Sequence, residues 1–366
     1  MKCLFENEFE EIFEKGVVPE GKSISWLMSQ LDLHDTAQKI EREYYSPKLQ
    51  RFFHYSVEFM IKLLVVMVYR KISPRQVHSK VTEEDLSYLL PANAPHGLPS
   101  RSTIHYFVKY RLGVEGMEYL MLSVGKKIAR YLKEENLIVD STPLLASRYC
   151  ANSLFNPHYR VKMDKAHIMS LGNYPLYMIH SEGTRNDQIF GKALIDVAQL
   201  MELQPKYVLM DAGYDSWEMH TRIFEKLQAH PIIQLRKNAI IHKEASEEGI
   251  QNWMNKFWKR DGANYCNTIE EKLRFLCGTE KRELVGLYLR NQNIKDNAKF
   301  TEIYKNRSAC ERKHAHIKSI VKFDVTGYRN EGRELYYLLH FIAFQIMNLA
   351  NLQNHFQNAT SLAGYR

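Results

Sequence analysis

Four polar side chains recur at helical spacing near the C-terminal end of the chain, at Tyr304, Arg307, Glu311 and Lys318. Relative to Glu311, the other three lie at positions −7, −4 and +7. Residues four and seven positions apart share one face of an α-helix, so these side chains are predicted to project together. A carboxylate between two cations and a phenol would suit a phosphate held beside a metal-binding acid. A solvated basic helix that binds no ligand is an equal alternative on this segment alone.

Two aspartates follow short apolar runs that are typical of central strands in an α/β sheet. Asp140 follows Leu-Ile-Val in NLIVDSTPLL, where Ser-Thr-Pro is expected to end the strand, and Asp211 follows the strand predicted over 207–210. Ligands of open α/β sheets gather at the carboxyl ends of the strands. Either aspartate alone is more commonly a turn former or a helix cap. With Glu311, the two aspartates form a candidate set of three acids.

These motifs resemble the DDE transposases of bacterial insertion sequences, in the branch that has a Tyr-Arg-Glu-Lys signature. The resemblance rests on VDSTP around Asp140, on LMDAGYDS around Asp211, and on the complete signature around Glu311. TRNDQ at 184–188 and GYDS at 213–216 also look like this family. The resemblance extends from about residue 137 to the C-terminus and is weaker over the N-terminal part.

The resemblance implies a ribonuclease-H-like core in which Asp140, Asp211 and Glu311 are catalytic and hold two Mg²⁺ or Mn²⁺ ions. Asp140 would bridge both ions, and each of the other two acids would hold one. Carboxylates suit these hard cations, and paired ions about 3.5–4 Å apart can stabilise both the attacking and the leaving oxygen. The implied DNA-binding residues are Tyr304, Arg307 and Lys318.

The implied reaction is cleavage of double-stranded DNA at the terminal inverted repeats of the element, followed by strand transfer into target DNA. A homodimer would pair the two ends. Two alternatives stay open: a catalytically inactive DNA-binding protein of the same fold, and another metal-dependent nuclease or phosphoesterase. The presence of all three acids favours the transposase.

Two further acids could replace the second aspartate of the set. Asp187 is predicted to be the N-cap of a helix that begins near Gln188. Asp215 is predicted to cap a helix over 217–228.

Composition agrees with a DNA-binding protein. The chain has 366 residues, of which 50 are Lys or Arg and 42 are Asp or Glu, and the resulting formal charge of +8 favours polyanionic partners. Its five cysteines are scattered and odd in number, which predicts a reducing compartment without a disulfide framework. No signal peptide and no uninterrupted apolar span of about 20 residues is evident, so no membrane crossing is expected. The predicted location is the bacterial cytoplasm, in association with the nucleoid when the protein acts.

The predicted fold is α/β, a ribonuclease-H-like mixed sheet flanked by helices, with an all-helical N-terminal domain and a short insertion before the last acidic helix. The predicted segments are the N-terminal domain at 1–130, the first part of the core at 131–236, the insertion at 237–299 and the closing helices at 300–366. Strands are expected near 137–140, 163–170, 174–181, 206–210 and 231–236, and helices near 188–203, 217–228 and 335–352.

Two segments outside the core have open interpretations. After the loop at 91–103, Ile104, Phe107, Val108 and Leu112 share one helical face, with His105, Lys109 and Arg111 left for solvent. This pattern fits a DNA-reading helix-turn-helix or a helical bundle that only packs on the core. In the insertion, a ribbon is expected at 273–277 and 284–290, and Trp253 and Trp258 are assigned to a small satellite core rather than to base stacking.

Overall fold

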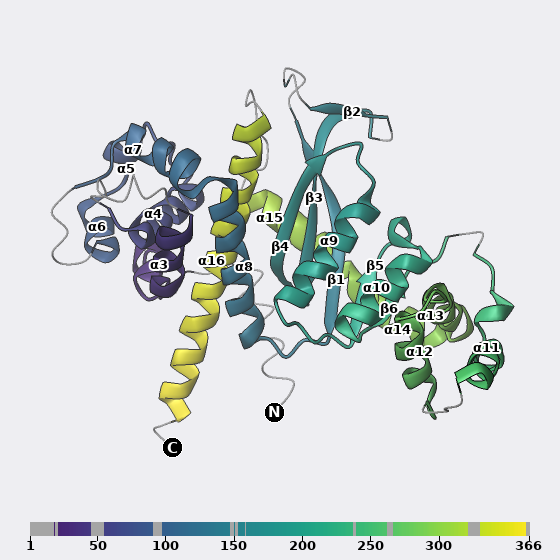
Figure 1. Ribbon diagram of the computed structural model, residues 1–366. Coiled ribbons are helices and arrows are strands. Elements are labelled where there is room, and N and C mark those ends of the chain that lie inside the picture. The colour runs from purple at the N-terminus through teal and green to yellow at the C-terminus, as the bar shows by residue number, and fades with distance from the viewer. Residues whose placement is uncertain are drawn as a thin grey trace.

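A mixed β-sheet with helices on both faces forms the centre of the molecule (Figure 1). The computed structural model describes residues 18, 21–44, 55–90, 97–146, 150, 153–157, 159–236, 239–261, 266–320 and 330–363. The strands are β1 (Asn136–Leu145), β2 (Leu154–Asn156), β3 (Val161–Leu171), β4 (Tyr174–Glu182), β5 (Tyr207–Met210) and β6 (His230–Ile233). All five expected strands therefore form, and the predicted mixed α/β fold is confirmed.

The sheet has an antiparallel half and a parallel half. β3 pairs antiparallel with β1, β4 and the short β2. β1, β5 and β6 run parallel, so their carboxyl ends lie at the same edge. Asp140 and Asp211 come from the two neighbouring strands β1 and β5, which is the arrangement that a shared site requires.

β1 does not end at Asp140, and the expectation that Ser-Thr-Pro ends it was wrong. The strand continues to Leu145. Its parallel pairing with β5 stops at Ile138, whereas its antiparallel pairing with β3 continues to the end of the strand. Pro143 fits because this part of β1 has a described strand partner on one side only. Asp140 therefore lies just beyond the point at which β5 leaves β1.

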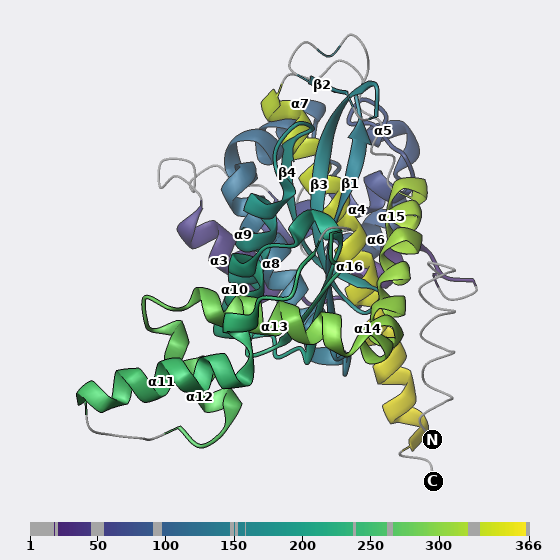
Figure 2. The ribbon, with the colours of Figure 1, turned by 90° about the vertical axis from the view of Figure 1, so that its right-hand side faces the viewer.

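Helices cover the two faces of the sheet differently. α9 (Asp187–Leu200) and α10 (Trp217–Leu227) lie on one face, and α14 (Asn297–Tyr304) and α15 (Ser308–Ile320) lie on the other (Figure 2). α8 (Gly113–Tyr131) and α16 (Asn330–Ala363) pack along β4. These elements confirm the helices expected near 188–203, 217–228 and 335–352.

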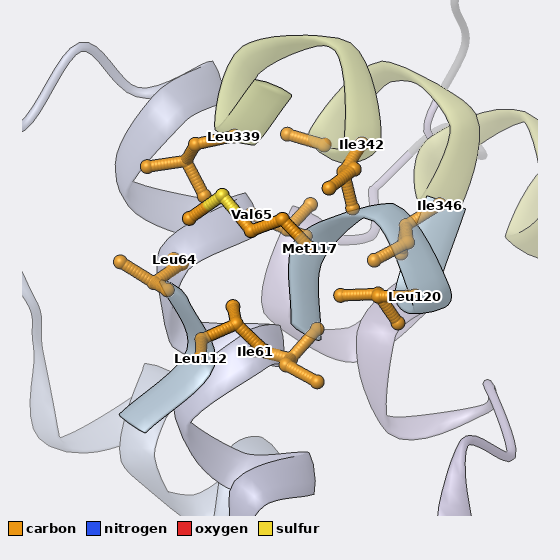
Figure 3. A pocket seen from close by; sticks show the side chains of 10 residues that line it. Ile61, Leu64, Val65, Leu112, Met117, Leu120, Leu339, Ile342 and Ile346 are labelled. Carbon is orange, nitrogen blue, oxygen red and sulfur yellow. The ribbon is translucent and has the colours of Figure 1, made fainter. Parts of the chain in front are cut away.

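All elements described before β1 are helical. They are α2 (Ile24–Ser29), α3 (His34–Glu43), α4 (Val57–Tyr69), α5 (Val77–Lys80), α6 (Glu83–Leu89), α7 (Arg101–Tyr106), a π-helix (Phe107–Leu112) and α8. α4, α8 and α16 share one hydrophobic core that continues into the sheet. A cavity of about 10 Å³ between these helices is lined only by apolar side chains, such as Val65, Met117 and Ile342 (Figure 3). The cavity is no larger than one water molecule requires, so it is a small packing gap within the core.

α16 contains one segment, at 332–355, that is long and apolar enough to span a membrane by length and composition. However, 83% of its most apolar window is buried inside the protein. The apolar stripe of this helix is therefore explained by packing against α4, α8 and β4.

The insertion is helical, and the ribbon expected there was wrong. α11 (Glu247–Asp261), α12 (Ile269–Cys277) and α13 (Glu283–Lys295) enclose a separate small core. The Thr268 side chain accepts from the N–H of Glu271, and the Glu271 carboxylate accepts from the N–H of Thr268, so a capping box starts α12. Trp253 packs against this core and stacks on Phe257 at 5.2 Å, in agreement with its assignment to a satellite core. The side chain of Trp258 lies outside the described part of the structure.

Candidate active site

Strand alternation places the two aspartates on the same face of the sheet. Ile138 is paired with Leu209 across β1 and β5, and both pack with Ile232 of β6 in a small core beneath α14. Successive side chains of a strand point to opposite faces, so residues two positions apart share a face. Asp140 lies two positions beyond Ile138, and Asp211 lies two positions beyond Leu209. They therefore project toward the chain that follows α14.

That chain brings Arg307 and His314 to Asp140. Arg307 ends a single 3₁₀ turn (η5, Lys305–Arg307) between α14 and α15, and its Nη2 lies 3.1 Å from Oδ1 of Asp140. Nδ1 of His314, on α15, lies 4.0 Å from Oδ2 of the same carboxylate. Arg307, Asp140 and His314 are all mostly buried. The segment that follows α14 therefore brings two basic side chains to β1.

Asp211 is held at the start of a 3₁₀ turn (η3, Ala212–Tyr214), where its Oδ1 accepts a hydrogen bond from the N–H of Gly213 at 2.9 Å. Burial, followed by the negative charge of Asp140, raises the pKa of Asp211. Arg307 and the Gly213 N–H act in the opposite direction. Two carboxylates that disfavour each other's charge in a partly buried site would be stabilised by a cation.

Tyr304, the last residue of α14, lies beside the carboxyl end of β6. Its hydroxyl donates a hydrogen bond to Oε1 of Gln234 at 3.1 Å, and its ring stacks on Phe300. The Arg307 guanidinium lies 5.9 Å from the centroid of the same ring. Burial raises the pKa of Tyr304 to about 12, so the hydroxyl remains a neutral donor at physiological pH. Tyr304 thus both packs and faces the site.

The structure does not complete the predicted set of three acids. Glu311 is exposed on α15, and in sequence it lies between the two residues that face Asp140. Lys318 is in the last turn of α15. Within the described ranges, no three His, Cys, Asp or Glu side chains are close enough together to hold a metal ion. The donor chemistry nevertheless suits Mg²⁺ or Mn²⁺, because Asp140 and Asp211 supply hard oxygen ligands that interact electrostatically.

The two rival acids have other partners, and both were wrongly predicted to be helix caps. The N-cap of α9 is Asn186, and Asp187 instead accepts hydrogen bonds from Lys165 and Ser141 in the first turn. The N-cap of α10 is Ser216. Asp215 is buried and pairs with Arg290 through both of its oxygens, at 2.9 and 3.0 Å. Although burial opposes it, the nearby His220 ring and the hydrogen-bonded Arg290 guanidinium hold the pKa of Asp215 well below its usual value.

Sequence reasoning missed the role of Gln234 altogether. Gln234 lies two positions beyond Ile232, just as the two aspartates follow their own strand residues, so it shares their face. This strand parity was available as a signal. The contact between Gln234 and Tyr304 joins positions 70 residues apart, so no local pattern in the sequence indicated it.

Comparison with known proteins agrees with this geometry. A family model for the transposase DDE domain matches residues 131–344, which is more than half of the chain and includes all three predicted acids. The chain therefore belongs to this family of transposases, whose substrate is DNA. No curated protein and no solved structure matches the chain.

Proposed function

We propose that the protein is a metal-dependent transposase of a bacterial insertion sequence, in the Tyr-Arg-Glu-Lys branch and with a ribonuclease-H-like core. The observation that carries the proposal is the placement of Asp140 and Asp211 on one face of the sheet, just beyond the paired residues of two neighbouring parallel strands, where Arg307 contacts Asp140. The strand order supports the core assignment, because the antiparallel strands β1, β3 and β4 precede the parallel pair β5 and β6.

Asp140, Asp211 and Glu311 are the proposed ligands of two Mg²⁺ or Mn²⁺ ions. When bound, the ions supply charge neutralisation at phosphorus and a more acidic attacking group. The protein's own contribution is positional. The Gly213 N–H orients the Asp211 carboxylate, and Arg307 holds that of Asp140 from the facing helix. Glu311, which is exposed on α15, is the third proposed ligand.

The signature residues are proposed to bind the DNA backbone. Arg307 has a planar fork of donors, so it can hold a phosphate while it still contacts Asp140. Tyr304 keeps its proton at physiological pH and can donate it in a hydrogen bond. Lys318, farther along α15, supplies a point charge. In the reaction, water cleaves a phosphodiester to leave a 3′-hydroxyl and a 5′-phosphate, and that hydroxyl then replaces one ester oxygen of target DNA.

The N-terminal helices, proposed as a domain over 1–130, are the proposed reader of the terminal inverted repeats. Tyr106 and Tyr110, at the α7–π-helix junction, are exposed, and their rings lie 5.1 Å apart. Lys109 and Arg111 lie over these rings at cation–π distance. Lys109 and Arg111 are half-buried rather than left for solvent, but exposed aromatic rings beside basic side chains suit nucleic acid. The proposed assembly is a homodimer with one element end per subunit, in the bacterial cytoplasm.

The test is Mg²⁺-dependent nicking of double-stranded DNA that carries the flanking inverted repeats. Asp211→Asn should abolish nicking and retain DNA binding, because it removes a ligand charge and leaves the basic surfaces unchanged. Asp196→Asn is the matched control: Asp196 is half-exposed on α9 and pairs with Arg222 of α10, so this variant should nick as the parent does. DNA binding without nicking by the parent would favour the inactive DNA-binding protein. Equal nicking by the parent and Asp211→Asn would refute the metal assignment, and cleavage without preference for the repeats would favour another nuclease.

A further inference from the structure

The first turn of α9 contacts the segments that carry both aspartates, from the opposite face of the sheet. We infer that this turn sets the relative position of Asp140 and Asp211, with Asp187, Gln188 and Gly191 as its positioning residues. α9 and α15 lie on opposite faces of the sheet (Figure 2), so the three residues act on the site through the segments that they contact. The inference rests on the proposed function and adds residues to it.

The contact with the Asp140 segment runs through Ser141. This residue follows Asp140 and points to the α9 face, where its Oγ donates to Oδ2 of Asp187 at 3.2 Å. Lys165 on β3 donates to Oδ1 of Asp187 at 2.7 Å, and it is the register partner of Pro143. Asp187 therefore bonds both to β1, at the residue after Asp140, and to β3. This link lies beyond Ile138, in the part of β1 that β5 no longer supports.

The contact with the Asp211 segment runs through the 3₁₀ turn that Asp211 starts. Nε2 of Gln188 donates to the carbonyl oxygen of Gly213 at 3.2 Å. The Gly213 N–H, in turn, holds the carboxylate of Asp211. Gln188 therefore fixes the peptide that orients this acid.

Gly191 allows α9 to lie close to the 3₁₀ turn that Asp211 starts. Tyr214 ends the 3₁₀ turn and is fully buried. A Cβ at Gly191 would lie 2.6 Å from Cε1 of Tyr214, a distance that real Cβ atoms do not show. The absence of a side chain lets the Tyr214 ring pack directly on α9. Both acid-bearing segments are thus held by one rigid helical turn.

Such supporting residues typically change metal affinity or activity about 10–100-fold when they are replaced. Mn²⁺ alone is the probe, titrated calorimetrically into the full-length protein. Asp187→Asn and Gln188→Ala should each weaken Mn²⁺ binding about tenfold, whereas Asp187→Glu should recover part of the loss. Asp196→Asn and Gln199→Ala, both farther along α9, are the matched controls. In nicking assays, kcat should fall and KM for DNA should stay unchanged.

Gln188→Ala is expected to fold like the parent, because the hydrogen bond that it removes is exposed. A loss of Mn²⁺ binding in this variant would therefore not be due to misfolding. Parent-like Mn²⁺ binding by Asp187→Asn and Gln188→Ala, with binding lost in Asp140→Asn and Asp211→Asn, would overturn the inference and leave the proposed function standing. Parent-like binding in all four variants would refute the metal assignment, and the inference with it. Equal losses in the two control variants would show a general effect of α9 and would also overturn the inference.

Discussion

Arg307 and Asp140 join a helix and a strand that lie 167 positions apart, with Nη2 of the arginine 3.1 Å from Oδ1 of the aspartate. The pair is mostly buried, and it fixes the side of the basic helical segment that faces the sheet. Because Glu311 lies one helical turn after Arg307, this contact also decides where the third predicted acid is presented.

Replacing Arg307 should change the pH dependence of metal binding. Arg307 lowers the pKa of Asp211, whereas burial and Asp140 raise it. In Arg307→Ala the pKa of Asp211 should rise further, so more of this carboxyl is protonated at a given acidic pH. The acid limb of Mn²⁺ binding is therefore expected to move to higher pH.

The measurement is Mn²⁺ affinity between pH 5 and 8 by calorimetry. Arg307→Lys keeps the charge and is the control, so its acid limb should stay near that of the parent. An acid limb that moves to lower pH in Arg307→Ala would contradict the electrostatic role.

A methyl group at Gly191 should destabilise the fold. Gly191→Ala would press Cβ into the ring of Tyr214, and overpacking of this kind costs about 1–3 kcal/mol. Gly278→Ala is the control, because the nearest atom to its Cβ would lie at 3.6 Å and its φ is −85°. Urea denaturation should show a lower midpoint for Gly191→Ala only. Equal midpoints for both variants would argue against close packing at this position.

Asp215 should be needed to hold the helical insertion on the core. It bonds Arg290 of α13 while itself fully buried, and removal of one partner from a buried pair typically costs about 3–5 kcal/mol. Asp215→Asn is therefore expected to lower the free energy of unfolding by that order. Glu270→Gln is the control, since it breaks an exposed pair with Arg274 and should cost about 0.5 kcal/mol or less.

The contribution of Asp215 should also depend on pH. Its pKa in the folded protein is below the usual value of 3.8, so the folded state binds the proton less well than the unfolded state. The stabilisation is present above about pH 4 and is lost as the pH falls below 3.8. Unfolding curves of the parent and Asp215→Asn should therefore converge in that acidic range. A constant difference down to pH 2 would contradict the assigned pair.

The exposed tyrosines of the N-terminal helices should contribute to DNA binding. Tyr106→Ala and Tyr110→Ala each remove an aromatic surface, and loss of one stacking contact typically costs about 1–3 kcal/mol, or at least about fivefold in affinity. Tyr159→Ala is the control, because Tyr159 is 49% exposed, between Tyr106 at 39% and Tyr110 at 56%, but lies beside β2. Fluorescence anisotropy with labelled inverted-repeat DNA would measure the difference. Equal affinity for all three variants would favour a bundle that only packs on the core.

Local patterns in the sequence were sufficient for much of the core. Short apolar runs predicted β5 and β6, and three- and four-residue steps predicted α9, because burial on a sheet enforces these periods. The helical spacing of Arg307 and Glu311 also predicted a shared face, and that stays a prediction because Glu311 is exposed on α15. The insertion was wrongly predicted to hold a ribbon, although Thr268 and Glu271 have the spacing of a capping box and were a local signal for a helix.

Tertiary structure decided what depends on distant partners. Pro143 lies within a strand because β5 leaves β1 early, and that divergence has no local signature. Asp215 was predicted to be a helix cap because its partner Arg290 is 75 positions away. The sequence by itself determined which acids are available and which strands carry the two aspartates. Only the packing of α9 and α15 on opposite faces of the sheet decided which acids meet, because such contacts join positions that no local period connects.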